Sequence, residues 1–354
     1  MTSSAIEYRL AKDNDRDAIL ALLAAKRDPG DRAAYVADRT SFWNWLHIDN
    51  PAADDESPLF VIAEEGATVV GAFGVIPARA LVDGLVRTVY WTTDLVVQEE
   101  MRGRGVGKKL LHEVFGLRDV CLTGTMTDQA MLMHERAGSR SIGLVRHLIL
   151  LNSVVSFSGF TVWLRNRYRS WKIEREVGPE DFAVEQCSVE EIGDEFDELW
   201  SRKAPEIAFG VVRDRRYMQW RYAEHPSNSY ECLIARRENR LCGVVVLRVR
   251  RSGGTTRGRI IDVIVPRSET ILMPVLLARA IQWFQSRGVH DVDALSADVE
   301  FQNLLQEWGF VNLPESENRH LTLNSAEGVD VNRLLSTSAQ WLISLGDTDN
   351  DVRL

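Results

Sequence analysis

The residues of this sequence best suited to chemistry form one short glycine-rich stretch, RGRGVGKK, at positions 102–109. An apolar segment that predicts a strand precedes it, and an apolar segment that predicts a helix follows it. Glycines at such a turn let the backbone approach a ligand closely, and the free amides of the first helical turn attract an anion. Arg102, Arg104 and Lys108 add positive charge. The stretch therefore predicts a phosphate site, and a pyrophosphate is its natural occupant.

Spacing separates three nucleotide-binding motifs that contain a loop of this kind. A P-loop requires a hydroxyl residue directly after its Gly-Lys pair, but Gly107 is followed by the letters KKL. A Rossmann fingerprint reads Gly-x-Gly-x-x-Gly after the first strand of its domain, whereas this loop reads Gly-x-Gly-x-Gly after the fourth expected strand. The pattern Arg-x-x-Gly-x-Gly, preceded by Val96 and Val97 and followed by an apolar helix, resembles motif A of the GNAT superfamily of acyl-CoA N-acyltransferases.

A second stretch extends this resemblance over the first half of the chain. GNAT domains commonly close with Asn-x-x-Ala-x-x-x-Tyr-x-x-x-Gly-Phe, and Thr127, Ala130, His134, Gly138 and Ser139 keep that frame with three different side chains. The resemblance implies acetyl-CoA, or another short acyl-CoA, as the cofactor, with backbone groups of the preceding strand holding its pantetheine arm. The residues that it implies for cofactor binding are Leu95, Val96, Val97, Arg102, Gly103, Arg104, Gly105, Val106, Gly107 and Lys108.

The same resemblance implies direct acyl transfer without a metal, in which an amine attacks the thioester, a base removes a proton and an acid protonates the leaving thiolate. His134 replaces the family's usual Tyr and is the candidate acid; the alternative is a neutral, partly buried imidazole. Asp94, on the strand before the loop, is the candidate base. Because Asp262 occupies the matching place in the second half, a structural role for Asp94 is equally well supported.

Residues of FWNWLHIDNP, at 42–51, are candidates for the acceptor site, since tryptophan stacks on sugar faces and on cationic amines. Trp45 recurs as Trp220 in the second half, which indicates core packing. Trp43, His47 and Asp49 have counterparts of different chemistry or shape, and we therefore expect them to determine acceptor specificity.

The elements that must position these residues occur twice along the chain. FWNWLHIDNP is echoed by YMQWRYAEHP at 217–226, and the expected strand WTTDLVV is echoed by RIIDVIV. Four anchors in the same order, at offsets of 168 to 175 residues, indicate duplication of a whole domain. The anchors pair Trp45 with Trp220, Gly71 with Gly243, Asp94 with Asp262, and Gly138 with Gly309.

Periodicity predicts a mixed α/β fold in each half, with a hairpin, a strand, a long helix, a strand, a helix and a closing strand. In the first half we expect strands at 6–11, 59–65, 68–79, 88–98, 119–123 and 141–151, and helices near 14–26, 40–48, 105–117 and 127–137. The expected domains are a GNAT domain with the CoA-binding loop at 1–152, a connector helix at 153–178, a degenerate GNAT-like domain at 179–326, and a C-terminal helix with an acidic tail at 327–354.

The second half lacks the glycine loop. After IIDVIVP the sequence runs RSETILMPVLLARAIQWF, which has no glycine and places a proline in the first helical turns. Leu305 occupies the position of His134. We therefore expect only the first half to bind CoA.

The expected connector contains an amphipathic pattern. Its apolar positions recur at helical spacing while Arg165, Arg169 and Lys172 project elsewhere. A basic amphipathic helix lies on a membrane surface or docks an acidic partner. We favour the alternative, a linker helix packed between domains, because the chain is acidic overall and one short helix anchors weakly. The apolar positions are Phe160, Trp163, Leu164, Tyr168 and Trp171.

Composition narrows the classes of function further. The chain has 354 residues, with 42 basic against 51 acidic side chains, and its net charge of −9 repels nucleic acid. Its four cysteines show neither zinc-ligand spacing nor a disulfide framework, which fits a cytoplasmic protein. Neither a secretory signal nor a spanning helix is expected. Alternating aspartates near the C-terminus lack the Gly and Glu of a calcium loop, so we expect Asp347, Asp349 and Asp351 to be solvated.

These observations favour an acyl-CoA-dependent, foremost acetyl-CoA-dependent, N-acyltransferase that acts on a small-molecule amine, with no nucleic-acid partner and no integral membrane segment. Amino sugars rank first among acceptors only by loose resemblance to GNAT proteins linked to surface polysaccharides. One alternative is an acyl-CoA-binding regulatory module without turnover. Another is an aminoacyl-tRNA-dependent ligase of related fold, against which the intact glycine loop and the acidic charge argue. A homodimer is left open.

Overall fold

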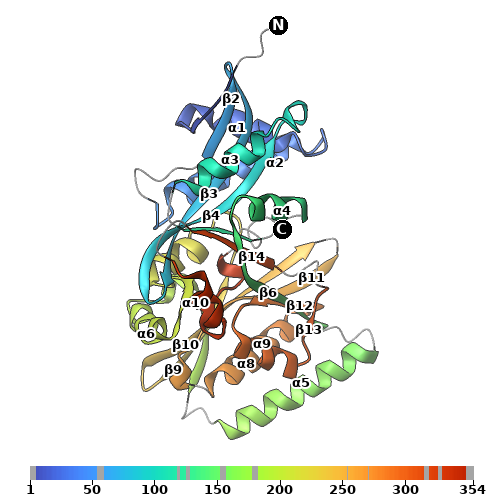
Figure 1. Ribbon diagram of the computed structural model, residues 1–354. Helices are drawn as coiled ribbons and strands as arrows, with labels where there is room; N and C mark the ends of the chain where they lie inside the picture. The colour runs from blue at the N-terminus through green and yellow to red at the C-terminus, as the bar shows by residue number, and fades with distance from the viewer. Residues whose placement is uncertain are drawn as a thin grey trace. The chain divides into compact units, whose positions relative to one another are not determined.

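The computed structural model describes residues 5–53, 60–117, 120–124, 128–151, 157–177, 182–252, 254–269, 271–314, 319–325 and 329–347. The chain forms two compact units. Unit 1 comprises Met1–Ala80, Val86–Gly143 and His320–Arg333, and unit 2 comprises Leu81–Leu85, Leu144–Arg319 and Leu334–Leu354. Each unit is mixed α/β, as the sequence predicts (Figure 1).

The sheet of unit 1 has the strand order β1-β2-β3-β4-β5-β14. β4 and β5 run parallel, whereas β1 with β2, β2 with β3, and β5 with β14 run antiparallel. Four helices complete the unit. Its elements are β1 (Ile6–Leu10), α1 (Arg16–Ala24), α2 (Arg32–Trp43), β2 (Phe60–Glu65), β3 (Thr68–Val82), β4 (Leu85–Val97), α3 (Val106–Phe115), β5 (Val120–Thr123), α4 (Asp128–Arg136) and β14 (Arg319–Ser325).

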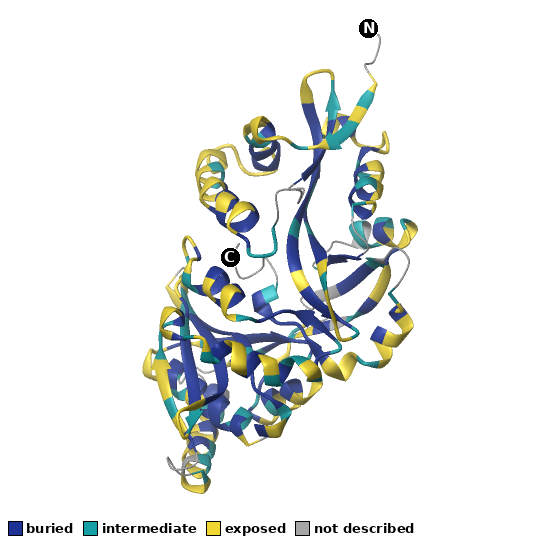
Figure 2. Ribbon diagram, turned by 90° about the vertical axis from the view of Figure 1, so that its left-hand side faces the viewer, coloured by how far each residue is buried: buried dark blue, intermediate teal, exposed yellow. Residues whose placement is uncertain are grey.

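Both faces of this sheet are covered, and β2 shows how its sequence achieves this. Phe60 and Ile62 lie in a core cluster with side chains of α1 and α2, whereas Val61 and Ala63 lie in a second cluster with side chains of α3. Successive side chains of a strand point to opposite faces, so a strand buried on both faces must be continuously apolar. Figure 2 accordingly shows the central strands mainly as buried.

The sheet of unit 2 has the order β6-β12-β11-β10-β9-β7, with β13 also paired to β6. β11 and β12 run parallel, and β8 pairs in parallel with β15 and also pairs with β3. The buried side of α8 dominates the core of this unit. The elements are β6 (Arg140–Leu151), α5 (Phe157–Glu176), β7 (Ala183–Cys187), α6 (Glu195–Lys203), β8 (Phe209–Val211), α7 (Arg215–Met218), β9 (Glu231–Arg237), β10 (Arg240–Ser252), β11 (Thr255–Ile264), α8 (Leu272–Ser286), β12 (Asp291–Ser296), α9 (Val299–Glu307), β13 (Val311–Asn312), α10 (Val331–Ser336) and β15 (Trp341–Leu342).

Each sheet receives one strand from the other half of the chain. β6 follows α4 of unit 1, yet its residues 146–151 pair antiparallel with β12 of unit 2, from Arg146 opposite Ser296 to Leu151 opposite Asp291. β14 follows the last strands of unit 2, yet it pairs with β5 of unit 1, with Thr322 opposite Thr123. The two strands therefore take corresponding places in the two sheets.

The glycine anchors of the sequence repeat have the same local surroundings in both units. A Cβ atom on Gly71 would lie 3.0 Å from Leu110 of α3, and one on Gly243 would lie 2.8 Å from Leu272 of α8. Each glycine therefore lets a helix approach its sheet closely. Gly138 and Gly309, which follow α4 and α9, both have a φ of 92°. That left-handed backbone at the end of a helix favours glycine.

The tryptophan anchors also correspond. Trp45 lies in a π-helical turn, Asn44–Ile48, and Trp220 lies in another, Gln219–Ala223. Both indoles are buried, and they contact Phe42 and Tyr217 edge to face, with ring centroids 6.0 and 5.7 Å apart. The core-packing role predicted for Trp45 is confirmed.

The predicted connector contains α5, which packs against α8. Residues 153–156 and 178 of the predicted connector lie outside the described residues. No helix in the described part of the chain is both long and apolar enough to cross a membrane.

The prediction of a solvated C-terminus is wrong at Asp347. Its carboxylate is fully buried and lies 2.7 Å from the Arg213 guanidinium, because a buried arginine requires a compensating charge. Asp349 and Asp351 lie outside the described residues.

The close approach at Gly243 yields a stability prediction. Gly243→Ala places a methyl group against Leu272 and Leu276, and we expect overpacking to cost about 1–3 kcal/mol in the free energy of unfolding. The control is Gly193→Ala, where no atom lies within 4 Å of the added Cβ. Urea unfolding followed by circular dichroism measures both. Equal midpoints for the two variants would contradict the proposed contact.

Candidate cofactor-binding site

The predicted glycine loop connects β4 to α3 through a short 3-10 turn, Glu99–Met101. Gly103 and Gly105 have φ values of 80° and 79°, a backbone conformation that favours glycine. No atom lies within 4 Å of a Cβ added at either position. Gly105 is the N-cap residue directly before α3. The two glycines thus give the loop a conformation that leaves open space before the helix.

Backbone amides at the start of α3 are available to an anion. The first hydrogen bond of the helix runs from the amide of Lys109 to the carbonyl of Gly105, at 3.0 Å. Among the described residues, no backbone carbonyl accepts from the amides of Val106, Gly107 or Lys108. Free amides together with the positive end of the helix dipole suit a phosphate group.

Exposed cations surround these amides. Arg102 and Lys108 are exposed, and Arg102 forms only a solvent-exposed ion pair with Glu99, 3.3 Å apart. Arg104 pairs with Glu65 of β2 at 3.0 Å, with both side chains partly exposed. Exposed pairs of this kind contribute little stability, so these guanidinium groups can be redirected to a phosphate at small cost.

The strand before the loop separates from its neighbour. In the described part of the chain, β4 pairs with β5 only through Tyr90 with Cys121 and Trp91 with Leu122. A hydroxyl hydrogen bond, Thr92 to Thr123 at 2.6 Å, follows. β4 then continues to Val97 without a described partner in β5. Parted strands offer backbone groups to an extended ligand, because buried amides and carbonyls require partners.

Lys26 is a residue near this strand that the sequence reasoning missed. It follows α1, and its ammonium group donates a hydrogen bond of 3.2 Å to the carbonyl of Leu95. Burial lowers the pKa of Lys26, and the charge of Arg102 lowers it further, while Asp94 opposes the shift. Leu95 is one of the predicted cofactor-binding residues, so Lys26 adds a cation beside them. No local pattern marks it, because 69 residues separate it from Leu95.

Asp94 lies on β4 with a φ of 57°, an unusual conformation for a residue other than glycine. Its carboxylate pairs with Arg39 of α2, and both side chains are buried. In unit 2, Asp262 accepts hydrogen bonds of 2.6 Å from Arg213 and 2.8 Å from Tyr222. Both matching carboxylates therefore neutralise a buried arginine. This geometry favours the structural alternative, and the role of Asp94 as a base stays a prediction.

His134 of α4 is 2% exposed and lies among aromatic rings. Its ring centroid is 5.6 Å from that of Phe115 and 6.4 Å from that of Phe73, both edge to face. Burial lowers the pKa of His134 to about 4, so the imidazole is neutral at neutral pH. This favours the packing alternative, and its role as the acid stays a prediction. The preceding Met133 instead faces the loop, 3.9 Å from a Cβ placed on Gly107.

The three predicted acceptor residues lie in different surroundings. Trp43 stacks on Phe60 with ring centroids 5.4 Å apart, and His47 meets Phe60 edge to face at 5.7 Å. Both residues are buried, and Trp43 belongs to the core cluster with α1. Asp49, directly after the π-helical turn, is exposed. Of the three, Asp49 alone offers its side chain to solvent, and their role in specificity stays a prediction.

The corresponding loop of unit 2 is shorter. In unit 1, residues 102–105 separate the 3-10 turn from α3, whereas residues 270–271 separate the turn Arg267–Glu269 from α8. The loop has therefore lost two of four residues and contains no glycine. The buried carboxylate of Glu269, the last residue of that turn, pairs with Arg237 at 3.2 Å and Arg240 at 3.0 Å. The cations near the turn of unit 2 are therefore paired with a carboxylate of the protein itself.

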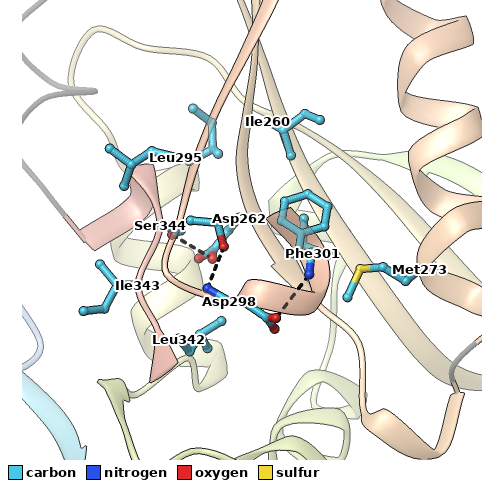
Figure 3. Close-up of a pocket in the computed structure, with 12 residues that line it drawn as sticks. Ile260, Asp262, Met273, Leu295, Asp298, Phe301, Leu342, Ile343 and Ser344 are labelled. Atoms are coloured by element: carbon cyan, nitrogen blue, oxygen red, sulfur yellow. Dashed lines mark hydrogen bonds between the residues drawn. The ribbon is translucent and has the colours of Figure 1, made fainter. Parts of the chain in front are cut away.

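A segment near the C-terminus fills the space beside the parted strands of unit 2. β11 and β12 pair as far as Ile260 with Ala294. Beyond this point Ser344 bridges to Ser296, and the amide of Ala297 donates to the carbonyl of Ile343 at 3.0 Å. Figure 3 shows residues 342–344 beside side chains of β11, β12 and α9. The remaining cavity of about 20 Å³ has room for roughly one water molecule.

Comparisons with known proteins agree with this geometry. Residues 20–118 match a family model described as acetyltransferase (GNAT) family. The fold is similar to that of a GCN5-related N-acetyltransferase from Anabaena variabilis, with a TM-score of 0.64 and 12% identity over 92% of this chain and 74% of that one. A probable N-acyltransferase from Enterococcus faecalis gives 0.64 and 10% over 92% and 73%. Saccharomyces cerevisiae N-myristoyltransferase with bound myristoyl-CoA gives 0.57 and 10% over 97% and 90%. No curated protein sequence matches.

The buried imidazole of His134 yields a prediction on pH. Its pKa of about 4 in the folded chain lies below the usual 6.5, so the unfolded chain takes up a proton first as the pH falls. We expect stability to be constant above pH 6.5 and to decrease toward pH 4, by up to about 3 kcal/mol from this group.

His134→Leu tests this, because the buried Leu305 occupies the matching position in unit 2. Urea midpoints measured across this pH range should show a weaker acid dependence in the variant. An identical pH dependence in the two proteins would show that His134 is not buried as neutral imidazole.

Proposed function

We propose that this chain, which carries a GNAT-family domain over residues 20–118, transfers an acyl group from acyl-CoA to an amine. One observation carries the proposal: left-handed glycines at 103 and 105 open α3 directly after a strand that parts from its parallel neighbour. This combination offers an anion site and an extended backbone site side by side. Acyl-CoA has a pyrophosphate and an extended pantetheine arm, and it supplies the activated acyl thioester.

The residues present fit this cofactor. The amides of Val106, Gly107 and Lys108 are directed at the space that Gly103 and Gly105 leave open, where a pyrophosphate finds donors and a helix dipole. Arg102, Arg104 and Lys108 neutralise its charge. Backbone groups of Leu95, Val96 and Val97 hold the arm, with Lys26 beside Leu95. Met133 borders the loop at Gly107.

The proposal assigns one cofactor site to each chain. Under it, both units are GNAT-like, and unit 2 has lost its site through three local changes. Its loop is two residues shorter and lacks glycine, the carboxylate of Glu269 pairs with arginines of the protein itself, and residues 342–344 occupy the space beside the parted strands. A pyrophosphate at that loop would find Arg237 and Arg240 already paired with Glu269 and no glycine that opens the backbone.

The proposal also names a class of acyl donor and a class of amine acceptor. We take acetyl-CoA or another short acyl-CoA as the donor, and a small-molecule amine, with amino sugars first, as the acceptor. The bound myristoyl-CoA of the yeast structure is a property of that protein. The turnover assay therefore compares acyl-CoAs of different chain length.

The burial of the His134 and Asp94 side chains bears on whether they act as the acid and the base of the reaction. Because its pKa is about 4, His134 is scarcely present as the acidic imidazolium near neutral pH, and Asp94 is paired with Arg39. We propose that both residues hold the structure around the site. Acceleration then comes from positioning the amine against the thioester, with the proton passing to solvent.

A second candidate is an acyl-CoA-binding regulatory module without turnover. The same two side chains support it, because His134 is buried among aromatic rings and Asp94 is paired with Arg39. Binding and turnover must therefore be measured separately.

The cofactor site is tested by Gly105→Ala. Alanine at this φ is strained and its Cβ enters the open space, so we expect CoA affinity to fall about tenfold or more in isothermal titration. Gly84→Ala is the matched control, because Gly84 has a φ of 77°, open space around it and a place in another turn. The wild-type chain should bind one CoA. Two sites per chain, or equal loss in both variants, would refute the assignment.

Turnover is tested by CoA-thiol release over a panel of amines with acetyl-CoA and longer acyl-CoAs. We expect release that depends on an amine. Asp94→Asn keeps a side chain that tolerates positive φ, and we expect its kcat to stay within about tenfold of wild type. A fall of about a hundredfold or more with unchanged CoA affinity would make Asp94 the base. CoA binding without release for any amine would favour the regulatory module.

A further inference from the structure

The helix α5 buries a different face from the one that its sequence suggests. Val162 and Ile173 pack against the core cluster of unit 2, and Asn166 and Ser170 are buried with them. These positions recur every three or four residues and form the side of α5 that meets α8. Figure 1 shows α5 beside α8 at the edge of unit 2.

The aromatic side chains of α5 lie on its other side, where they are exposed. The exposed fractions are 43% for Phe160, 53% for Leu164, 61% for Tyr168 and 49% for Trp171. Their spacing of four, four and three residues places them on one stripe of a helix. The side of α5 toward α8 is formed by smaller side chains instead, and this stripe lies away from it.

Ring contacts join the stripe into one surface. Phe160 stacks on Trp163 with centroids 6.0 Å apart, and Tyr168 meets Trp171 at 5.7 Å. The guanidinium of Arg167 lies 5.0 Å from the centroid of Trp163. Arg175 lies at the same distance from Trp171. The stripe thus combines large apolar rings with cations held directly beside them.

The charge of α5 opposes that of the whole chain. The helix carries five basic residues and two glutamates, a net charge of +3, whereas the chain carries −9. Arg165, Arg167, Lys172 and Arg175 are exposed. A positive surface on an acidic protein attracts an anionic surface while the rest of the molecule is repelled from it, which fixes the orientation of docking.

We propose that the exposed stripe of α5 docks on an anionic membrane surface. Tryptophan, tyrosine and phenylalanine settle at the boundary between headgroups and acyl chains, and neighbouring arginine and lysine side chains reach the phosphates. Three exposed cations, Arg167, Lys172 and Arg175, and four exposed large apolar residues on one helix supply both parts of this interaction, whereas the guanidinium of Arg165 donates to the carbonyl of Trp308. Docking leaves α5 parallel to the surface, packed on α8 as it is in the structure.

The test is flotation of the full chain with vesicles of phosphatidylcholine alone, or with about a third phosphatidylglycerol. We expect binding to the anionic vesicles at least about tenfold stronger than to the neutral ones, decreasing with added salt. Leu164→Ser combined with Trp171→Ser should weaken it about tenfold or more by removing apolar contact. Lys172→Glu combined with Arg175→Glu should weaken it similarly and reduce its salt dependence.

Matched controls lie in the same unit. Val311→Ser removes an equally exposed apolar side chain on β13, and Arg216→Glu reverses an exposed charge on α7. Both should bind as wild type does, and circular dichroism melts verify that every variant folds. Equal binding to both vesicle types, or no binding, would overturn the proposal. A dimer in light scattering that dissociates in the Leu164→Ser, Trp171→Ser variant would also overturn it, since the stripe would then belong to a second copy of the chain.

Discussion

The parting of two parallel strands is the constraint on which both units depend. Strands that diverge inside a folded unit leave backbone donors and acceptors that must find partners elsewhere. In unit 2 the chain supplies them: Ser344 bridges to Ser296, and Ile343 accepts from Ala297. In unit 1 the pairing of β4 with β5 ends after Trp91, and the open glycine loop follows. The parted strands are therefore closed by protein in unit 2, and in unit 1 they form the place that we propose for the cofactor.

A buried ion pair accompanies the parted strand in each unit. Arg39 of α2 pairs with Asp94, and Arg213, two residues before α7, pairs with Asp262, so each strand is joined to the segment that leads into a π-helical turn. Burying one member of such a pair alone would leave an uncompensated charge, so the two residues must be retained together. The matching ion pairs in the two halves therefore support a structural role for both carboxylates.

Local signals in the sequence predicted the loop correctly but not the roles of side chains around it. Positive φ at Gly103 and Gly105 is a property of a few adjacent residues, so the spacing of glycines reveals it. The burial of His134 depends on Phe73 and Phe115, which come from β3 and α3, and no local pattern reveals that contact. Lys26 reaches Leu95 across 69 residues, and it was missed for the same reason.

The sequence by itself determined the order of elements, the duplicated anchors and the glycine loop, because each depends on periodicity or on the backbone freedom of neighbouring residues. Only the tertiary structure decided which sheet receives β6 and β14, since an apolar strand pairs with whichever edge the fold presents. It also decided which side of α5 is buried. Both sides of that helix satisfy a helical repeat. The side with smaller side chains packs against α8, because close packing against a neighbouring helix favours small side chains.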